Sequence, residues 1–226
     1  MPEPRSPIDP AYQDQIDVRA EFGVARLGIA ANVMWHKDPR TLLFHLARYK
    51  FVSKLLFGKR RVLEVGCGDA FFTRIVQQEV DSVTAIDCER EFIEDIQARM
   101  SPAWPIDCRQ YDILDGPISG PFDAAYSLDV LEHIESVDEK RFIGNMCASV
   151  DGPGLVIIGT PSLNSQVYAS ASSKLGHINC KSPEQLRTLM GEFCDEVLMF
   201  GMNDEVVHTG FLEMAHYLWA IGLSRS

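Results

Sequence analysis

The chain has 226 residues, enough for one α/β domain, and its 46% hydrophobic and 23% charged residues are ordinary for a globular protein. Its net charge of −11 repels phosphate backbones and disfavours a nucleic-acid partner. The six cysteines form no CxxC pair, which argues against a zinc ribbon and favours a reducing, cytoplasmic compartment. The sequence shows no signal-peptide pattern and no apolar stretch of membrane-spanning length, so we expect no membrane partner.

The elements expected in the first half follow one another with short breaks. Residues 11–38 have a weak helical pattern, and "TLLFHLARYKFVSKLL" has apolar residues at helical spacing up to a turn at Gly58. Strand "RVLEVG" comes next, then a helix from about Phe71 to Glu79, strand "SVTAID", helix "EREFIEDIQARM" and a short strand ending near "QYDI".

The second half adds strands "FDAAYSLD" and "GLVIIGT". Two capping boxes predict helix starts, one at Ser136 with Glu139 and one at Ser182 with Gln185. "EVLMFGM" and "EMAHYLWAIGL", joined by the polar stretch "NDEVVHTG", predict a final antiparallel hairpin.

This alternation predicts an α/β fold, Rossmann-like and doubly wound, with a mostly parallel seven-stranded sheet and an antiparallel C-terminal hairpin. We expect a single domain over residues 1–226, with an N-terminal helical or lid segment at 1–57 and a core at 58–226.

A glycine turn follows the first strand in "VLEVGCGDAF". A strand, a glycine turn and a helix form a site for a polar or anionic ligand at the helix N-terminus. The spacing from Gly66 through Gly68 to Ala70 is G-x-G-x-A. A dinucleotide fingerprint would need its third glycine at Phe71, so an NAD-dependent reductase is disfavoured.

Acidic residues accompany the strand ends. Glu64 lies on the first strand, and Asp87 ends the second, where a carboxylate can accept hydrogen bonds from both ribose hydroxyls. Asp112 follows the third strand and could accept from an adenine amino group, with Ile113 offering an apolar face beside the ring.

Four motifs in order resemble the class I S-adenosylmethionine-dependent methyltransferases: "LEVGCGDA", "AIDCE", "FDAAYSLDVLEHI", and "VIIGTPS" with the later "GHINCKSPEQLRTLM". The third is similar to the small-molecule branch that includes ubiquinone-type O-methyltransferases. The resemblance covers roughly Arg48 to the C-terminus and implies S-adenosyl-L-methionine as cofactor, with S-adenosyl-L-homocysteine as its product.

The resemblance also implies cofactor contacts. Gly66 and Gly68 would approach the methionine part, Asp87 the ribose, and Asp112 with Ile113 the adenine. The others it implies are Ser127 and Leu128 beside the sulfonium, Arg48 at the cofactor carboxylate, and the motif residues Glu64, Cys67 and Cys88.

Histidines follow several strands at the edge where ligands bind in open parallel sheets. A hydroxyl acceptor benefits from a base, and histidine suits neutral pH. We expect His177 to be that base, with His133 as second choice and His208 behind them. Histidines together with Asp129 and Glu132 do not have a diagnostic metal spacing, so no metal site is predicted.

The predicted function is therefore methyl transfer to a small-molecule acceptor, a hydroxyl or amine of a metabolite, sugar or natural-product intermediate. The alternative is a non-catalytic S-adenosylmethionine-binding protein with a regulatory or scaffold role. The sequence leaves the oligomeric state open. The proline-containing N-terminal segment around Trp35 and the long connection from Asn164 to Lys181 predict a mobile lid.

Overall fold

A computed structural model gives the fold and describes residues 7–224. Residues 1–6 and 225–226, the two ends of the expected domain, lie outside the described residues. The strands are β1 (Arg61–Val65), β2 (Ser82–Asp87), β3 (Asp107–Gln110), β4 (Phe122–Leu128), β5 (Val150–Pro161), β6 (Cys194–Asn203), β7 (Val206–His208) and β8 (Tyr217–Ser224).

Helices connect most of these strands. The α-helices are α1 (Gln13–Phe22), α2 (Ile29–Lys37), α3 (Arg40–Leu55), α4 (Thr73–Gln77), α5 (Arg90–Arg99), α6 (Glu139–Ala148), α7 (Ala171–Gly176) and α8 (Pro183–Gly191). The short 3-10 helices are η1 (Pro10–Tyr12), η2 (Ile113–Asp115), η3 (Leu131–His133), η4 (Leu163–Tyr168) and η5 (Leu212–Met214).

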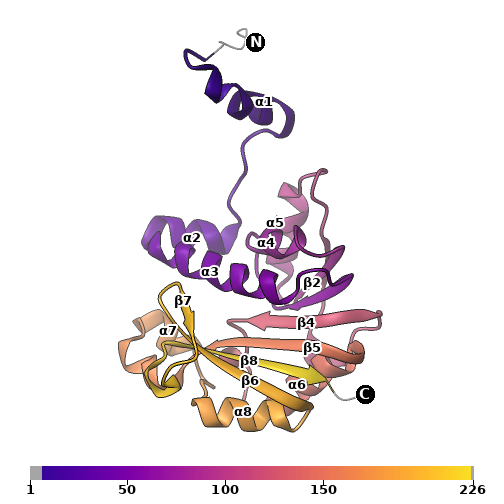
Figure 1. The fold of residues 1–226 in the computed structure, drawn as a ribbon, viewed down its shortest axis with the longest axis vertical. Coiled ribbons are helices and arrows are strands. Elements are labelled where there is room, and N and C mark those ends of the chain that lie inside the picture. The colour runs from indigo at the N-terminus through magenta and orange to yellow at the C-terminus, as the bar shows by residue number, and fades with distance from the viewer. Residues whose placement is uncertain (1–6, 225–226) are drawn as a thin grey trace.

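The strands form one sheet in the order β3-β2-β1-β4-β5-β8-β6-β7 (Figure 1). The pairs β2–β3, β1–β2, β1–β4 and β4–β5 are parallel. β8 lies between β5 and β6 and is antiparallel to both. The predicted doubly wound, mostly parallel sheet with an antiparallel C-terminal pair is therefore confirmed.

The sheet has eight strands where the sequence predicted seven. The polar stretch "NDEVVHTG" does not simply link β6 to β8, because it contains β7, which pairs antiparallel with residues 201–203 of β6. Asp204 turns the chain in the left-handed conformation, with φ +50°. Two consecutive valines, Val206 and Val207, then suit an extended strand. The local turn and these β-branched residues explain the additional edge strand.

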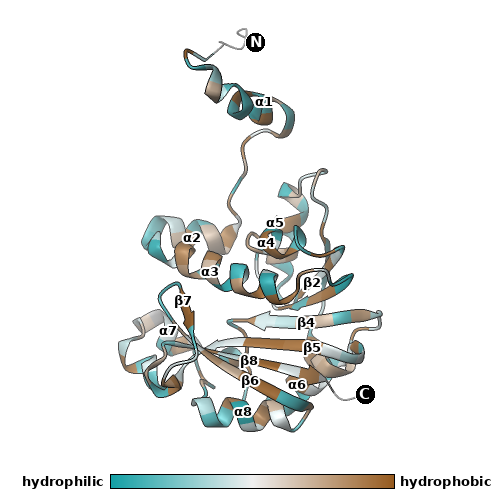
Figure 2. Cartoon of the chain, in the orientation of Figure 1, coloured by the Kyte–Doolittle hydropathy of each residue, from teal (hydrophilic) through white to brown (hydrophobic). Residues whose placement is uncertain are grey.

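The two faces of the sheet bury different helices. Val62 points to the cluster that contains Val52 and Leu56 of the α3 region, whereas its neighbour Leu63 points to the cluster that contains Phe142 of α6 and Leu186 of α8. This alternation is the period of two expected of a strand buried on both faces. β5, in the middle of the sheet, is largely brown and therefore apolar in Figure 2.

One of the two predicted capping boxes is present. Ser182 Oγ accepts from the Gln185 backbone N–H at 3.2 Å, and Gln185 Oε1 accepts from the Ser182 N–H at 2.9 Å. The prediction of a capping box at Ser136 is wrong, because α6 begins only at Glu139 and its N-terminus has no side-chain cap. The Glu139 carboxylate instead accepts from Asn179 Nδ2 at 2.9 Å and pairs with Lys181. The Glu139 carboxylate, which the local pattern assigned to the helix cap, thus binds residues 179 and 181 instead.

The N-terminal helices differ in how they contact the rest of the chain. α1 projects away from the sheet in Figure 1 and has no buried residue. α3 packs on the sheet through Tyr49 and Val52. The first turn of α2 is held by the glycine loop, since Asp69 Oδ2 accepts from the Ala31 N–H at 2.8 Å. A change in that loop would therefore be felt directly by α2.

The carboxyl ends of the parallel strands share one edge of the sheet. The arrow of β4 points toward the side where α7 lies in Figure 1. The loops after β1, β2 and β4 meet there, which is the usual position of ligand sites in such sheets. Within residues 7–224, no helix is both long and apolar enough to cross a membrane.

Candidate active site

The loop after β1 brings bare backbone to this edge. Gly66 and Gly68 have φ values of +74° and +53°, a region that favours glycine. A Cβ on Gly66 would lie 2.2 Å from Val130 Cγ2, whereas a Cβ on Gly68 would meet nothing within 4 Å. Gly66 is thus needed for packing, and Gly68 leaves open space beside its backbone.

Ala70 completes the turn in an unusual conformation. Its φ is +50°, although it carries a Cβ, and it is buried. Its N–H donates to the Cys67 carbonyl at 2.9 Å, which closes the loop. A left-handed residue with a Cβ costs about 1–2 kcal/mol. A small residue therefore stands at position 70, two residues after Gly68, because the chain reverses direction there and a larger side chain would have to fit into the core.

Asp87 organises the same loop from the end of β2. Its Oδ2 accepts from the Gly68 N–H at 2.8 Å, and its Oδ1 accepts from the Glu89 N–H at 2.9 Å. Burial raises the pKa of the Asp87 carboxyl above its ordinary value. Each carboxylate oxygen retains a further lone pair, so the group can still accept from a ligand hydroxyl.

The loop after β3 lies at the same edge of the sheet and contributes Asp112 and Ile113 to the site. Asp112 Oδ1 accepts from the Leu114 N–H at 2.9 Å, which fixes the start of η2. Ile113 is 4% exposed and faces the core, and the Tyr111 hydroxyl donates to the Gly116 carbonyl at 3.2 Å. A carboxylate and an apolar side chain therefore lie side by side, as recognition of a purine would need.

These walls enclose a cavity of about 390 Å³, within the range of small-molecule sites. The sequence-predicted residues that line it are Gly66, Gly68, Asp87, Cys88, Asp112, Ile113 and His133. Its other lining residues are Val65, Glu89, Phe92, Tyr111, Asp129, Val130, Ile134 and Phe142. The predicted residues that do not line it are Arg48, Glu64, Cys67, Ser127, Leu128 and His177.

Glu64 and Ser127 do not line the cavity but form buried hydrogen bonds next to it. The Glu64 carboxylate is 1% exposed and accepts from Tyr49 Oη at 2.7 Å and Thr73 Oγ1 at 2.6 Å. Burial raises the pKa of Glu64 to about 7. Ser127 Oγ donates to the Val65 carbonyl at 2.8 Å. Both side chains therefore hold strands and helices together instead of facing the cavity.

Arg48 reaches the cavity through Asp129. Its Nη1 donates to both Asp129 oxygens, at 2.9 and 2.8 Å, and its guanidinium carbon lies 3.9 Å from the centre of the Tyr217 ring. The Arg48 side chain is only 16% exposed, and its buried Nε has no hydrogen-bond partner within residues 7–224. Asp129 has φ +57°, so this ion pair fixes a residue in a strained conformation at the end of β4.

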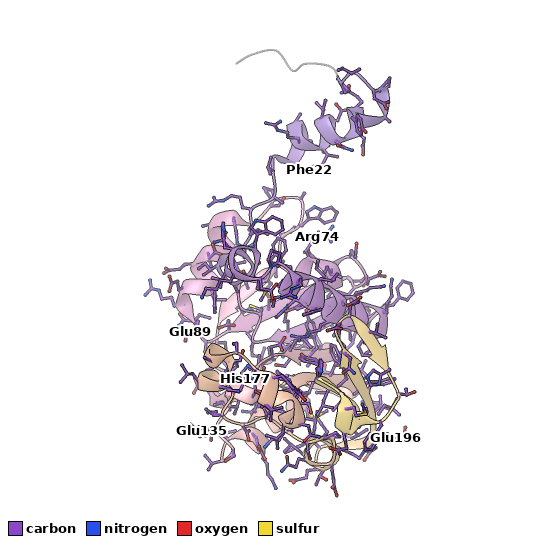
Figure 3. All side chains as sticks on the ribbon, turned by 90° about the vertical axis from the view of Figure 1, so that its left-hand side faces the viewer. Phe22, Arg74, Glu89, Glu135, His177 and Glu196 are labelled. Carbon is purple, nitrogen blue, oxygen red and sulfur yellow. The ribbon has the colours of Figure 1, made fainter. Side chains whose placement is uncertain are left out.

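The two predicted base candidates lie together. The rings of His133 and His177 are 5.3 Å apart between centroids, in an edge-to-face arrangement. Burial, together with the neighbouring His133, lowers the pKa of His177. Figure 3 looks onto this edge of the sheet and labels His177 and Glu89 on it, whereas Phe22 projects with α1. His208 lies on β7 and is not among the cavity residues.

Glu132 completes this group and had no assigned role in the sequence prediction. It is fully buried, and its Oε2 accepts from Thr160 Oγ1 at 3.0 Å. Burial, followed by the charge of Asp129, raises the pKa of Glu132 to about 8. Asp129 and Glu132 both follow the end of β4 in "LDVLEHI". Their position after a parallel strand was the signal in the sequence that could have indicated a role in the site. Tyr111, Val130 and Phe142 gave no separate signal, because an apolar wall residue resembles any core residue in sequence.

Comparisons with known proteins agree with this geometry. Residues 62–154 match the family model described as a methyltransferase domain. The chain is 25% identical over 159 residues to the ubiquinone biosynthesis O-methyltransferase of Chromobacterium violaceum, covering 67% of this chain and 67% of that protein. It is 24% identical over 145 residues to the mitochondrial ubiquinone biosynthesis O-methyltransferase of Schizosaccharomyces pombe, covering 58% of this chain and 52% of that protein.

The chain thus spans between 52% and 67% of the length of these curated relatives. Among solved structures, the N-methyltransferase NodS from Bradyrhizobium japonicum WM9 in complex with S-adenosyl-L-homocysteine has a TM-score of 0.57 at 20% identity. That alignment covers 84% of this chain and 87% of NodS, so the two share a fold.

Proposed function

Because this chain belongs to the class I S-adenosylmethionine-dependent methyltransferases, we propose that it transfers a methyl group from that cofactor to a small-molecule acceptor. The observation that carries the proposal is the pairing of Gly68 with Asp87. Gly68 has open space where a side chain would stand, and its N–H is held by the carboxylate of Asp87. A cofactor chain and its ribose can approach such a backbone closely.

The cofactor positions follow from the walls of the cavity. Asp87 would accept from the ribose hydroxyls, and Asp112 with Ile113 would hold adenine. The methionine part would lie along Gly66 and Gly68, with Cys88 beside the ribose. Arg48 would contact the cofactor carboxylate through the guanidinium nitrogens that Asp129 leaves free. Ser127 and Leu128 would set the depth of the cavity floor near the sulfonium.

The acceptor would enter between Asp129, His133 and His177. S-adenosylmethionine supplies a methyl group on a sulfonium, which is already a good leaving group, so the protein contributes mainly by positioning. The side chain of His177 would act on the acceptor hydroxyl or amine, with His133 beside it. Relatives named as O-methyltransferases and an N-methyltransferase of the same fold support either acceptor class.

The formal charge of −11 favours a metabolite over a nucleic acid as acceptor. A cytoplasmic location stays a prediction from the cysteine pattern. The division into an N-terminal lid segment at 1–57 and a core at 58–226 also stays a prediction, to be tested by ligand-dependent protection.

Calorimetric titration with S-adenosylhomocysteine tests the proposal. Asp87→Ala removes two charge-assisted hydrogen bonds to the ribose, each worth about 1.5–3 kcal/mol, although they need not add. We expect at least a tenfold loss of affinity. The affinity of Asp87→Asn for S-adenosylhomocysteine should lie between those of Asp87→Ala and the wild type, because the asparagine amide oxygen can still accept from the Gly68 N–H. Asp107→Ala, an exposed acid on β3 paired with Arg109, is the matched control and should bind normally.

Unchanged affinity in Asp87→Ala would overturn the cofactor assignment. Labelled S-adenosylmethionine with a panel of hydroxyl and amine acceptors then tests transfer itself. Tight binding without product for any acceptor would favour the regulatory or scaffold alternative.

A further inference from the structure

Helix α1 has no packing partner among the described residues of its own chain. It has ten residues, none of them buried, and both views show it projecting away from the sheet, with Phe22 at its C-terminal end in Figure 3. Its hydrogen bonds within residues 7–224, such as that from Gln13 Nε2 to Asp17 Oδ1 at 2.8 Å, join only residues 9–23. Isolated helices shorter than about 12–15 residues are marginal in water. A second surface is therefore needed to stabilise α1.

α1 presents acidic and apolar side chains next to one another. Asp14, Asp17 and Glu21 are spaced by three and four residues, so they share one side of the helix. Val18 lies four residues after Asp14, and Phe22 four residues after Val18, so both border the acidic side chains. Val18 is 46% exposed and Phe22 is 50% exposed. We call these five side chains the α1 stripe.

The outer side of α3 carries the opposite charge. Five exposed residues recur every three or four positions along this helix and therefore lie on one side of it: Arg40, Leu43, Leu46, Lys50 and Lys54. We call them the α3 face. Leu43 is 50% exposed and Leu46 is 40% exposed. Three cations thus surround two exposed leucines, in a chain whose net charge is −11.

The charges on these two surfaces are only partly neutralised within the chain. Arg40 pairs with Asp38, and Lys54 pairs with Glu79. Lys50 forms no ion pair within residues 7–224, and neither do the three acids of the α1 stripe over the same range. The α1 stripe and the α3 face are therefore complementary in both charge and apolar character, and in this structure neither covers the other.

We propose that two copies of this chain form a twofold-symmetric dimer in which the α1 stripe of each copy docks on the α3 face of the other. Such an interface is isologous, because each copy gives and receives the same contact. Burial of Val18 and Phe22 against Leu43 and Leu46 would provide the hydrophobic part of the affinity. The acids and Lys50 would steer the encounter and fix the orientation of the helices.

The connection between α1 and α2 suits an exchanged arm. Residues 23–28 form no helix or strand, and six extended residues span up to about 20 Å. The far end of this connection is fixed, because Gly28 is buried and the Ala31 N–H donates to Asp69 Oδ2 at 2.8 Å. An arm that leaves from a fixed point and points away from its own sheet is placed to reach a second copy. The two equivalent contacts of the dimer would reinforce each other.

Sedimentation velocity of the full-length chain, from low to high micromolar concentration, tests the dimer. We expect reversible dimerisation that weakens as NaCl is added, because salt screens the charges. Phe22→Asp on the α1 stripe and Leu46→Asp on the α3 face should each weaken dimerisation by at least about tenfold, since each places a charge in the apolar contact. Val137→Asp is the matched control, because Val137 is 85% exposed in the loop before α6, outside both surfaces, and it should dimerise like the wild type.

Mixing the two defective variants tests the exchange itself. The Phe22→Asp chain keeps an intact α3 face, and the Leu46→Asp chain keeps an intact α1 stripe, so one complete contact forms only between the two chains. With a fluorescent label on one of them, the mixture should dimerise more strongly than either variant alone. Circular dichroism verifies that each variant is folded.

Three results would overturn the proposal. They are a wild-type chain that stays monomeric at every concentration, wild-type dimerisation of both Phe22→Asp and Leu46→Asp, and no gain in dimerisation on mixing them. A monomer whose α1 is protected in hydrogen exchange would show that the helix docks on its own chain instead. No residue of the α1 stripe or the α3 face lines the cavity, so these measurements are independent of the Asp87 titration.

Discussion

Replacing Gly66 and Gly68 by alanine in turn separates packing from ligand access within one loop. Both residues have positive φ, so each substitution costs about 1–2 kcal/mol in backbone strain. Only at Gly66 does the new methyl overlap a neighbour, since it would lie 2.2 Å from Val130 Cγ2. Such overpacking adds about 1–3 kcal/mol. Gly66→Ala should therefore lower the free energy of unfolding by roughly 2–5 kcal/mol, and Gly68→Ala by roughly 1–2 kcal/mol.

The two variants should rank in the opposite order for ligand affinity at temperatures where both are folded. The methyl of Gly68→Ala enters open space beside the proposed cofactor path, so S-adenosylhomocysteine should bind at least tenfold more weakly. Urea unfolding gives the stabilities, and calorimetry gives the affinities.

A double-mutant cycle isolates the contact. Val130→Ala removes the methyl that Gly66→Ala would strike, so the double variant should be about 1–3 kcal/mol more stable than the sum of the single effects predicts. Equal stabilities for the two glycine variants, together with no favourable coupling to Val130, would refute this reading of the loop.

Three further predictions concern other parts of the site. Burial raises the pKa of Glu64 from an ordinary 4.5 to about 7, so between these pH values the folded state binds a proton that the unfolded state has lost. The contribution of Glu64 to the free energy of unfolding therefore falls as the pH rises from about 4.5 to 7, and is constant above that. Glu64→Gln should gain about 3 kcal/mol relative to wild type over that interval in urea titrations, and parallel pH profiles would contradict it. His177→Ala should lower kcat about 10²–10⁴-fold with a hydroxyl acceptor while S-adenosylhomocysteine affinity stays within a few-fold; wild-type turnover would remove His177 from the chemistry. Hydrogen exchange should slow around Trp35 and over 164–181 when S-adenosylhomocysteine binds, and exchange that is already slow and unchanged there would rule out a lid.

The sequence by itself determined the features that depend on local geometry. Short, mostly apolar runs located β1, β2 and β4 within about a residue, since a strand that is buried on both faces is apolar along most of its length. The spacing of Gly66 and Gly68 located the ligand turn, because positive φ favours glycine whatever the surroundings. The box at Ser182 formed as predicted, since its partners lie within one helical turn.

Only the tertiary structure decided which distant side chains meet. It directed Glu139 to Asn179 and Lys181 instead of a helix cap, turned Glu64 into the core, and joined Arg48 to Asp129. It also brought His177 beside Glu132 and His133, a group that no spacing in the sequence indicates. Such pairings depend on how segments that are distant in the sequence pack against one another. The strength of an ion pair or hydrogen bond also depends on burial, which a pattern of residue types does not specify.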